Sequence, residues 1–210
     1  MQSLEVAWSD LFAARSKIRE RYRSIYEIPL LKNRRGLFRL FLRNGMKVLD
    51  CGAGFRGAKI EIERLGIRLL YKSMDIDKRL PHDFYTLADI QEKFDAVLLF
   101  EVLEHLSLTE AKGLLLALRE LLADEGLLLA SVPNTYNPSR YMADATHRTF
   151  FAYDELCGLI SLCGFEILYV ARSFNDAAHR YIVKVYILGF LFRLLSLDYA
   201  KSIFVVGKKT

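Results

Sequence analysis

The sequence predicts an α/β fold, with an open, mostly parallel sheet and helices on both faces. Three observations carry this prediction. Apolar runs of strand length alternate with stretches of helical spacing through most of the chain, as expected where crossover helices join parallel strands. The run 95–100 (DAVLLF) is apolar after its first residue, which is typical of a buried parallel strand. The segment 48–57 (VLDCGAGFRG) is a short strand that enters a glycine-rich turn.

Apolar spacing and the residues that begin or end helices predict the individual elements. Pro29 separates two N-terminal helices because it lacks an N–H, Ser107 and Glu110 have capping-box spacing, and Gly66 suits a helix C-terminus. The segment 135–148 has a loop-like composition. We expect helices at 11–26, 30–43, 58–65, 111–122, 153–162 and 181–197. We expect strands from Val48 and at 67–74, 84–87, 95–100, 126–132, 165–170 and 202–206.

Length and composition indicate one globular domain over residues 1–210. Apolar residues make up 52% and charged residues 26% of the chain, which excludes an intrinsically disordered protein. We divide the domain into a basic helical segment (1–45), a core that holds the glycine loop (46–172), an apolar insertion (173–201) and the last strand (202–207).

Cysteine usage and the N-terminus favour a cytoplasmic protein. Cys51, Cys157 and Cys163 are odd in number and lack metal-type spacing, so they fit a reducing compartment as small apolar residues. The first ten residues contain acids and no positively charged region ahead of an apolar run. We therefore expect no signal peptide.

Positive charge is concentrated near the N-terminus. The segment 1–47 contains eleven Lys and Arg against four acids, whereas the whole chain has a net charge of +5. Such a segment, interleaved with aromatic residues, could face a polyanion or an anionic membrane. The alternative is a pair of amphipathic helices whose charged faces are solvated and whose aromatic residues pack on the core.

The glycine-rich turn is a candidate ligand cradle. Asp50 ends the strand, and Gly52 and Gly54 permit a sharp turn with close approach to backbone N–H groups. Asp75 follows the next strand, 21 residues beyond Gly54. This spacing is close to the offset of about 20 residues at which dinucleotide-type folds place an acid on ribose hydroxyls.

The segment 181–197 is strongly apolar, but Lys184 and Arg193 interrupt it. A membrane span needs about 20 predominantly apolar residues, so we do not expect this segment to cross a bilayer. The two charges are nine residues apart and should project from nearly opposite sides of one helix. A buried or partner-covered helix, a lipid-facing helix and a substrate lid remain open.

Four segments in this order resemble the class I S-adenosylmethionine-dependent methyltransferases, particularly the branch that includes the ubiquinone-pathway O-methyltransferases. They are VLDCGAG, the strand-end Asp75, FDAVLLFEVLEHL, and GLLLASVPN followed by a Thr-His-Arg loop and a helix ending CGFEI. The resemblance covers about residues 37–206. It implies a Rossmann-like, seven-stranded sheet whose last strand, 202–206, is antiparallel, with S-adenosylmethionine as the cofactor.

The resemblance also implies a set of cofactor-binding residues. Arg56 stands where the family often has a third glycine, which leaves the loop geometry open. The residues carried over are Asp50, Gly52 and Gly54 around the methionine moiety, Asp75 at the ribose with its neighbour Ile76, Asp89 and Ile90 at the adenine, and Phe100 against the cofactor.

Methyl transfer from a sulfonium requires alignment of acceptor and donor, and a neutral oxygen acceptor also needs a base. His105 and His147 are the candidate catalytic bases, although a structural hydrogen bond is an equally good explanation for each. Glu101, Glu104 and the two histidines also resemble the divalent-metal ligands of small-RNA 2′-O-methyltransferases. The Glu-Val-Leu-Glu-His string occurs in relatives without metal, so we assign no metal.

We therefore expect O-methylation of a small or lipid-like acceptor, with peripheral membrane contact through 181–197. Metal-assisted RNA 2′-O-methylation and a non-catalytic cofactor-binding module are the alternatives. Amino-group methylation of DNA or protein is disfavoured, because 100–102 reads Phe-Glu-Val instead of an Asn-Pro-Pro-Tyr type. Nucleic acid is not the expected partner, and a homodimer remains open.

Overall fold

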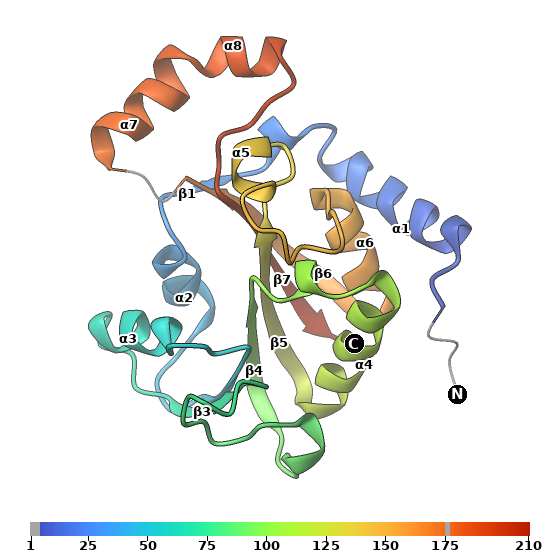
Figure 1. The fold of residues 1–210 in the computed structure, drawn as a ribbon, viewed down its shortest axis with the longest axis vertical. Coiled ribbons are helices and arrows are strands. Elements are labelled where there is room, and N and C mark those ends of the chain that lie inside the picture. The colour runs from blue at the N-terminus through green and yellow to red at the C-terminus, as the bar shows by residue number, and fades with distance from the viewer. Residues whose placement is uncertain (1–4, 175–176) are drawn as a thin grey trace.

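A seven-stranded sheet forms the centre of the computed structural model, which describes residues 5–174 and 177–210 (Figure 1). The strand order is β1-β6-β7-β5-β4-β2-β3. Only β7 is antiparallel to its neighbours, β5 and β6. The prediction of a mostly parallel sheet with an antiparallel last strand is confirmed. The strands are β1 (Leu30–Leu31), β2 (Lys47–Cys51), β3 (Leu70–Met74), β4 (Phe94–Phe100), β5 (Leu122–Pro133), β6 (Phe165–Ser173) and β7 (Ser202–Lys209).

Helices cover both faces of the sheet. Figure 1 shows α2 and α3 on one side and α1, α4 and α6 on the other. Each face has its own apolar core, because alternate residues of β4 point in opposite directions: Leu98 packs in the first and Leu99 in the second. The helices are α1 (Trp8–Arg21), α2 (Arg35–Phe41), α3 (Gly57–Arg64), α4 (Leu108–Leu121), α5 (Pro138–Tyr141), α6 (Tyr153–Leu162), α7 (Ala178–Ile182) and α8 (Gly189–Leu194). Short 3₁₀ turns occur at Ile25–Glu27, Leu87–Asp89 and Leu103–His105.

The strand order reverses at β2, so the carboxyl ends of β2, β3 and β4 are where a ligand crevice is expected. The chain runs from β2 outward to β3 and then returns to β4 on the other side of β2. In open parallel sheets, ligands bind outside the carboxyl ends of the strands where the order reverses. The glycine loop after β2, Asp75 after β3 and Glu101 after β4 all follow strands that end at this edge.

The predicted helix 30–43 is wrong in its first part. Leu30 and Leu31 pair in parallel with Arg172 and Ser173 of β6, and the Arg172 N–H donates to the Pro29 carbonyl at 2.9 Å. Helix α2 begins only at Arg35. Leu30 and Leu31 thus form an edge strand of the sheet, because they pair with β6, which lies about 140 residues later in the chain.

Helix α1 ends at Arg21, earlier than the predicted end of the first helix, and packs against α6. Two of its arginines explain part of the N-terminal positive charge. The Nε atoms of Arg15 and Arg19 donate to Asp154 Oδ2 at 3.0 and 2.7 Å, and the Asp154 side chain is fully buried. Trp8 remains 75% exposed, so the expectation that the N-terminal aromatic residues pack on the core is wrong at this position.

The predicted strand 84–87 is also wrong. Phe84 forms an isolated bridge with Met74, and Leu87–Asp89 is a 3₁₀ turn. Asp83 ties this connection to β3, because its carboxylate accepts from the backbone N–H and the hydroxyl of Ser73 at 2.8 and 2.9 Å. The seventh strand is therefore β1 at the opposite edge.

The prediction of one continuous helix over 181–197 is wrong. Helix α7 continues into a π-helical stretch, Val183–Ile187, and α8 begins after a bend at Leu188. A π turn is wider than an α turn and shifts the side chains that follow it. Figure 1 shows these helices projecting beyond the sheet at the top. Among the described residues, no helix is long and apolar enough to cross a membrane.

A buried ion pair connects the end of this projecting segment to the sheet. Arg172 Nη1 lies 2.6 Å from Asp198 Oδ1, with the two side chains 9% and 3% exposed. Asn134 Nδ2 donates to Asp198 Oδ2 at 2.9 Å. Each polar group therefore has a partner, as buried charges require.

Replacing Asp198 by Ala should lower the free energy of unfolding by about 3–5 kcal/mol, because it leaves the buried guanidinium without a carboxylate. Urea denaturation followed by circular dichroism measures this change. Glu63→Ala, which removes an exposed i,i+4 pair with Lys59, is the control and should change the midpoint little. Equal effects of the two substitutions would contradict this account.

Candidate active site

The glycine loop leaves strand β2 with its backbone open to a ligand. Gly52 and Gly54 have φ values of 77° and 47°, which glycine adopts at little cost. A Cβ added at Gly52 would lie 2.4 Å from Val102 Cγ2, so the loop packs closely on the segment after β4. A Cβ added at Gly54 would meet nothing within 4 Å. The loop therefore offers an uncovered surface at Gly54.

Asp50 is a buried carboxylate at the end of β2. It is 3% exposed and accepts from the Tyr71 hydroxyl at 2.5 Å. Burial raises the pKa of Asp50 to about 6, whereas the Tyr71 hydrogen bond and the positive charge of Arg34 act in the opposite direction. Above this pH the carboxylate is ionised and can attract a cationic ligand group.

Asp75 is oriented by backbone donors. Its Oδ2 accepts from the Gly54 N–H at 2.8 Å, and its Oδ1 accepts from the Asp77 N–H at 3.0 Å. Each oxygen retains acceptor capacity, so the carboxylate can also receive two adjacent hydroxyls. Ile76, immediately after it, is 83% exposed. The structure thus brings Asp75 against the glycine loop, as the spacing predicts.

Arg56 has a structural explanation. It adopts a left-handed φ of 55° immediately before α3, a conformation that normally favours glycine. Its guanidinium donates to the Pro81 carbonyl. Arg56 therefore adopts a backbone conformation for which glycine is usually preferred. Its side chain also links the connection after β3 to the glycine loop.

Asp89 and Ile90 lie at the 3₁₀ turn that replaces the predicted strand. Asp89 is exposed, and its carboxylate accepts from the Thr86 N–H at 3.1 Å. Ile90 is 6% exposed and belongs to the core that also contains Cys51 and Met74. These contacts give both residues a structural role, in addition to the adenine contact that the resemblance implies.

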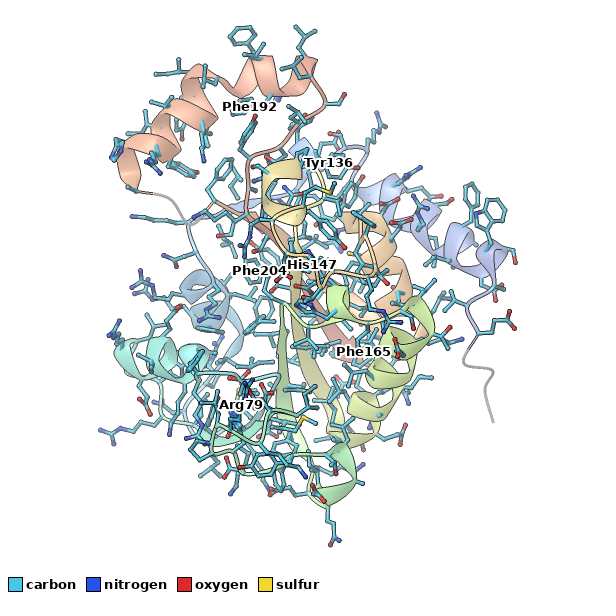
Figure 2. The ribbon with its side chains drawn as sticks, viewed as in Figure 1. Arg79, Tyr136, His147, Phe165, Phe192 and Phe204 are labelled. Atoms are coloured by element: carbon cyan, nitrogen blue, oxygen red, sulfur yellow. The ribbon has the colours of Figure 1, made fainter. Side chains whose placement is uncertain are left out.

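Phe100 and Glu101 mark the end of β4. The Phe100 ring lies 6.0 Å from that of Phe204, which Figure 2 labels, and the Arg34 guanidinium lies 5.8 Å from the Phe100 ring centre. Glu101 has a left-handed φ of 55°, which costs a non-glycine residue about 1–3 kcal/mol. Its carboxylate accepts from Ser131 Oγ at 2.9 Å. Strain of this kind occurs often at functional sites.

The two predicted catalytic histidines lie together, with ring centres 5.0 Å apart. His147 Nδ1 is 2.9 Å from the Tyr141 carbonyl, which can only accept, so we infer that Nδ1 carries the proton. His105 Nδ1 is 2.9 Å from Thr146 Oγ1, which already donates to Asp144 at 2.7 Å. Thr146 Oγ1 must therefore accept from His105, so Nδ1 carries the proton in His105 as well. In the neutral form of each ring, Nε2 is then the nitrogen with the lone pair.

Glu104 lies beside these lone pairs. It is 1% exposed, and neither carboxylate oxygen has a hydrogen-bond partner among the described residues. One ligand atom from each of Glu104, His105 and His147 lies within 4.8 Å of the others. Glu101 lies outside this group. Burial, and then the charge of Glu101, raise the pKa of Glu104 to about 8.

The sequence does not predict that several other residues lie near these strand ends. Tyr71 meets Asp50 only because β2 and β3 are paired. Arg34, from the N-terminal segment, donates to Glu61 of α3 at 3.0 Å, and Arg140 lies 3.5 Å from Glu101. Their positions depend on contacts between distant segments.

The comparisons with known proteins agree with this geometry. Residues 20–170 match the family model described as a methyltransferase domain. No curated protein matches the chain. A SAM-dependent methyltransferase from Archaeoglobus fulgidus superposes with a TM-score of 0.63 at 16% identity, covering 97% of this chain and 100% of that one.

Two further structures share the fold. Magnesium protoporphyrin IX methyltransferase from Synechocystis PCC 6803, with bound SAH, has a TM-score of 0.60 at 12% identity and covers 98% of this chain and 89% of its own. A cyclopropane synthase from Mycobacterium tuberculosis has a TM-score of 0.54 at 12% identity, covering 80% and 79%. S-adenosylmethionine is thus the cofactor, and the chain belongs to the methyltransferase domain family.

Proposed function

We propose that this enzyme O-methylates a small or lipid-like acceptor, as in the branch that resembles the ubiquinone-pathway O-methyltransferases. The arrangement at the carboxyl ends of β2, β3 and β4 carries this proposal. Asp50 would hold the cofactor's ammonium group, Gly54 would expose the loop to its methionine moiety, and Asp75 would accept its ribose hydroxyls.

The histidine pair supports an oxygen acceptor. S-adenosylmethionine supplies an electrophilic methyl group. The protein would align the acceptor with it and take the acceptor's proton as the O–C bond forms and the methyl–sulfur bond breaks, which leaves S-adenosylhomocysteine. His147 Nε2 would take that proton, because its Nδ1–H is already held by the Tyr141 carbonyl. His105, with the same tautomer, would serve as a second base or orient the acceptor.

Replacing Asp75 by Ala should weaken S-adenosylmethionine binding at least tenfold, because it removes the acceptor of the ribose hydroxyls. Isothermal titration calorimetry measures the affinity. Asp77→Ala is a matched control two residues away, and the Asp77 carboxylate pairs with the exposed Arg79. Unchanged binding in Asp75→Ala, or equal loss in both variants, would contradict the assignment.

A divalent cation is the second candidate at this site, favoured by the convergence of Glu104, His105 and His147. One nitrogen of each imidazole and one oxygen of Glu104, which has no hydrogen-bond partner among the described residues, lie within 4.8 Å of one another. A shared proton or a bound cation would relieve the repulsion among these acceptors. A cation held there would polarise the acceptor oxygen, so the histidines would be ligands and not bases.

Calorimetric titration with Mn²⁺ separates the two roles. If the cation belongs to the site, Mn²⁺ should bind in a one-to-one ratio and His147→Ala should abolish binding, while His179→Ala, at an exposed position, leaves it intact. Lack of Mn²⁺ binding by the parent protein would remove this candidate and leave the histidines as bases.

We further propose that α7, the π turn and α8 contact a membrane surface. Seven large apolar side chains of this segment are exposed, and several recur at helical spacing on the outer side. They are Ile182, Val183, Tyr186, Ile187, Phe190, Leu194 and Leu195. An exposed apolar stripe of this kind is typical of interfacial helices.

Two cations of this segment, Lys184 and Arg193, lie against aromatic rings of the protein body. Lys184 Nζ lies 6.0 Å from the Phe174 ring centre and 5.9 Å from that of Tyr199, and the Arg193 guanidinium lies 5.6 Å from the Tyr26 ring centre. Residues 177–195 contain no Asp or Glu. This outward apolar face is the reverse of that of an ordinary solvent-exposed helix. The exposed Arg180 and the lack of acidic residues favour an anionic lipid surface.

The double variant Ile187→Ser with Phe190→Ser should reduce co-sedimentation with phosphatidylcholine–phosphatidylglycerol vesicles at least tenfold, because each buried apolar side chain contributes about 1.5–3 kcal/mol. Leu40→Ser, which removes an exposed apolar residue of α2, is the control. The proposal fails if the parent protein does not bind vesicles. It also fails if the double variant instead disrupts a dimer, which would show that a second copy covers the stripe.

A further inference from the structure

A cavity of about 340 Å³ opens at the carboxyl end of the sheet, beside the cofactor crevice. Its floor is formed by the ends of β4, β5, β6 and β7, and its walls by α2, α3 and α5. Phe100 and Glu101, which end β4, lie between it and the crevice. Polar and charged side chains make up most of its lining.

The charge of the cavity lining is predominantly positive. Five cationic side chains line it, against only Glu61 and Glu101. Both acids already form ion pairs, Glu61 with Arg34 at 3.0 Å and Glu101 with Arg140 at 3.5 Å. The remaining cations are Arg35, Arg64 and Lys201. Across residues 5–174 and 177–210, neither Arg35 nor Arg64 has an ion-pair partner.

A buried hydroxyl provides an independent sign of a missing ligand. Ser173 lines the cavity and is 3% exposed. Its Oγ has no hydrogen-bond partner in the described part of the chain, although buried hydroxyls are nearly always satisfied. Ser173 ends β6, and its carbonyl accepts from the Lys201 N–H at 2.6 Å, so its backbone is fixed. An oxyanion in the cavity would satisfy this donor.

Arg34 connects the cavity to the cofactor site. Its guanidinium lines the cavity, and its positive charge also lowers the pKa of Asp50. A Cβ added at Gly57, the first residue of α3, would lie 3.1 Å from Arg34 Nη2. The cavity therefore adjoins the loop that receives the methionine moiety, where an acceptor must lie to receive a methyl group.

We propose that this cavity binds an anionic group, a phosphate or a carboxylate, of the methyl acceptor. Arg35 and Arg64 supply the charge, and the Ser173 hydroxyl donates a hydrogen bond to one oxygen. The inference rests on the proposed function and narrows its acceptor to an anionic molecule. A lipid-like acceptor would then place its head group here.

Nuclear magnetic resonance titration with inorganic phosphate tests this site in protein saturated with S-adenosylhomocysteine, at constant ionic strength. We expect saturable shifts of the backbone amides of Arg35, Ser173 and Ser202. Arg64→Gln should weaken phosphate binding about fivefold, since a charge-assisted hydrogen bond is lost. Arg68→Gln, at an exposed position in the connection between α3 and β3 and outside the cavity lining, should leave the affinity unchanged.

Ser173→Ala separates binding from folding. It should weaken phosphate binding about fivefold and leave the melting temperature unchanged or higher, because the hydroxyl has no partner to lose in the free protein. A parallel titration with acetate identifies the group: tighter phosphate binding indicates a phosphate acceptor, and tighter acetate binding a carboxylate. Both results support the proposal.

Two results would overturn the inference. Phosphate binding that is absent, or equal in the parent, Arg64→Gln and Ser173→Ala, removes the site. Phosphate binding that occurs only without S-adenosylhomocysteine would assign the cavity to the cofactor's own carboxylate. Because S-adenosylhomocysteine binding is measured separately by calorimetry, its retention in either case leaves the cofactor assignment standing.

Discussion

The pairing of β2 with β3 on one side and β4 on the other is the constraint on which the rest of the site depends. Since all three strands are parallel, the residues that follow them meet at one edge. Asp75 can therefore accept from the Gly54 N–H, and Val102 packs on Gly52. The crevice is a consequence of strand order, and its chemistry depends on which residues end each strand.

Buried acids attach the peripheral segments to this sheet. Asp154 of α6 receives two arginines of α1, and Asp198 receives Arg172 of β6. Each pair places a cation of one segment on a carboxylate of another, where an unpaired charge would be costly. The pairing with Asp154 accounts for two of the eleven N-terminal cations. Within the described part of the chain, the cavity arginines Arg35 and Arg64 have no carboxylate partner, which makes them the better candidates for an anionic ligand.

The two proposed surfaces are compatible with one class of acceptor. The stripe on α7 and α8 exposes apolar side chains outward while Lys184 lies against aromatic rings. The cavity offers arginines and an unpartnered serine hydroxyl close to the cofactor loop. An amphiphile with an anionic head group would match both, the apolar part at the stripe and the head group in the cavity. Solved structures named for different reactions share this fold, so the fold alone does not identify the acceptor.

The sheet class, the glycine loop and the position of Asp75 could be predicted from the sequence, because they depend on short-range patterns: apolar runs, glycine spacing and the residues that end strands. Leu30–Leu31 as an edge strand and the outward apolar side of the projecting helix became evident from the three-dimensional structure alone. The structure also leaves Glu101 outside the group of Glu104, His105 and His147, and it brings Arg34, Arg64 and Ser173 to the lining of one cavity. These features depend on contacts between residues far apart in the chain, and local spacing carries no information about which distant partner supplies a hydrogen bond, a charge or a packing surface.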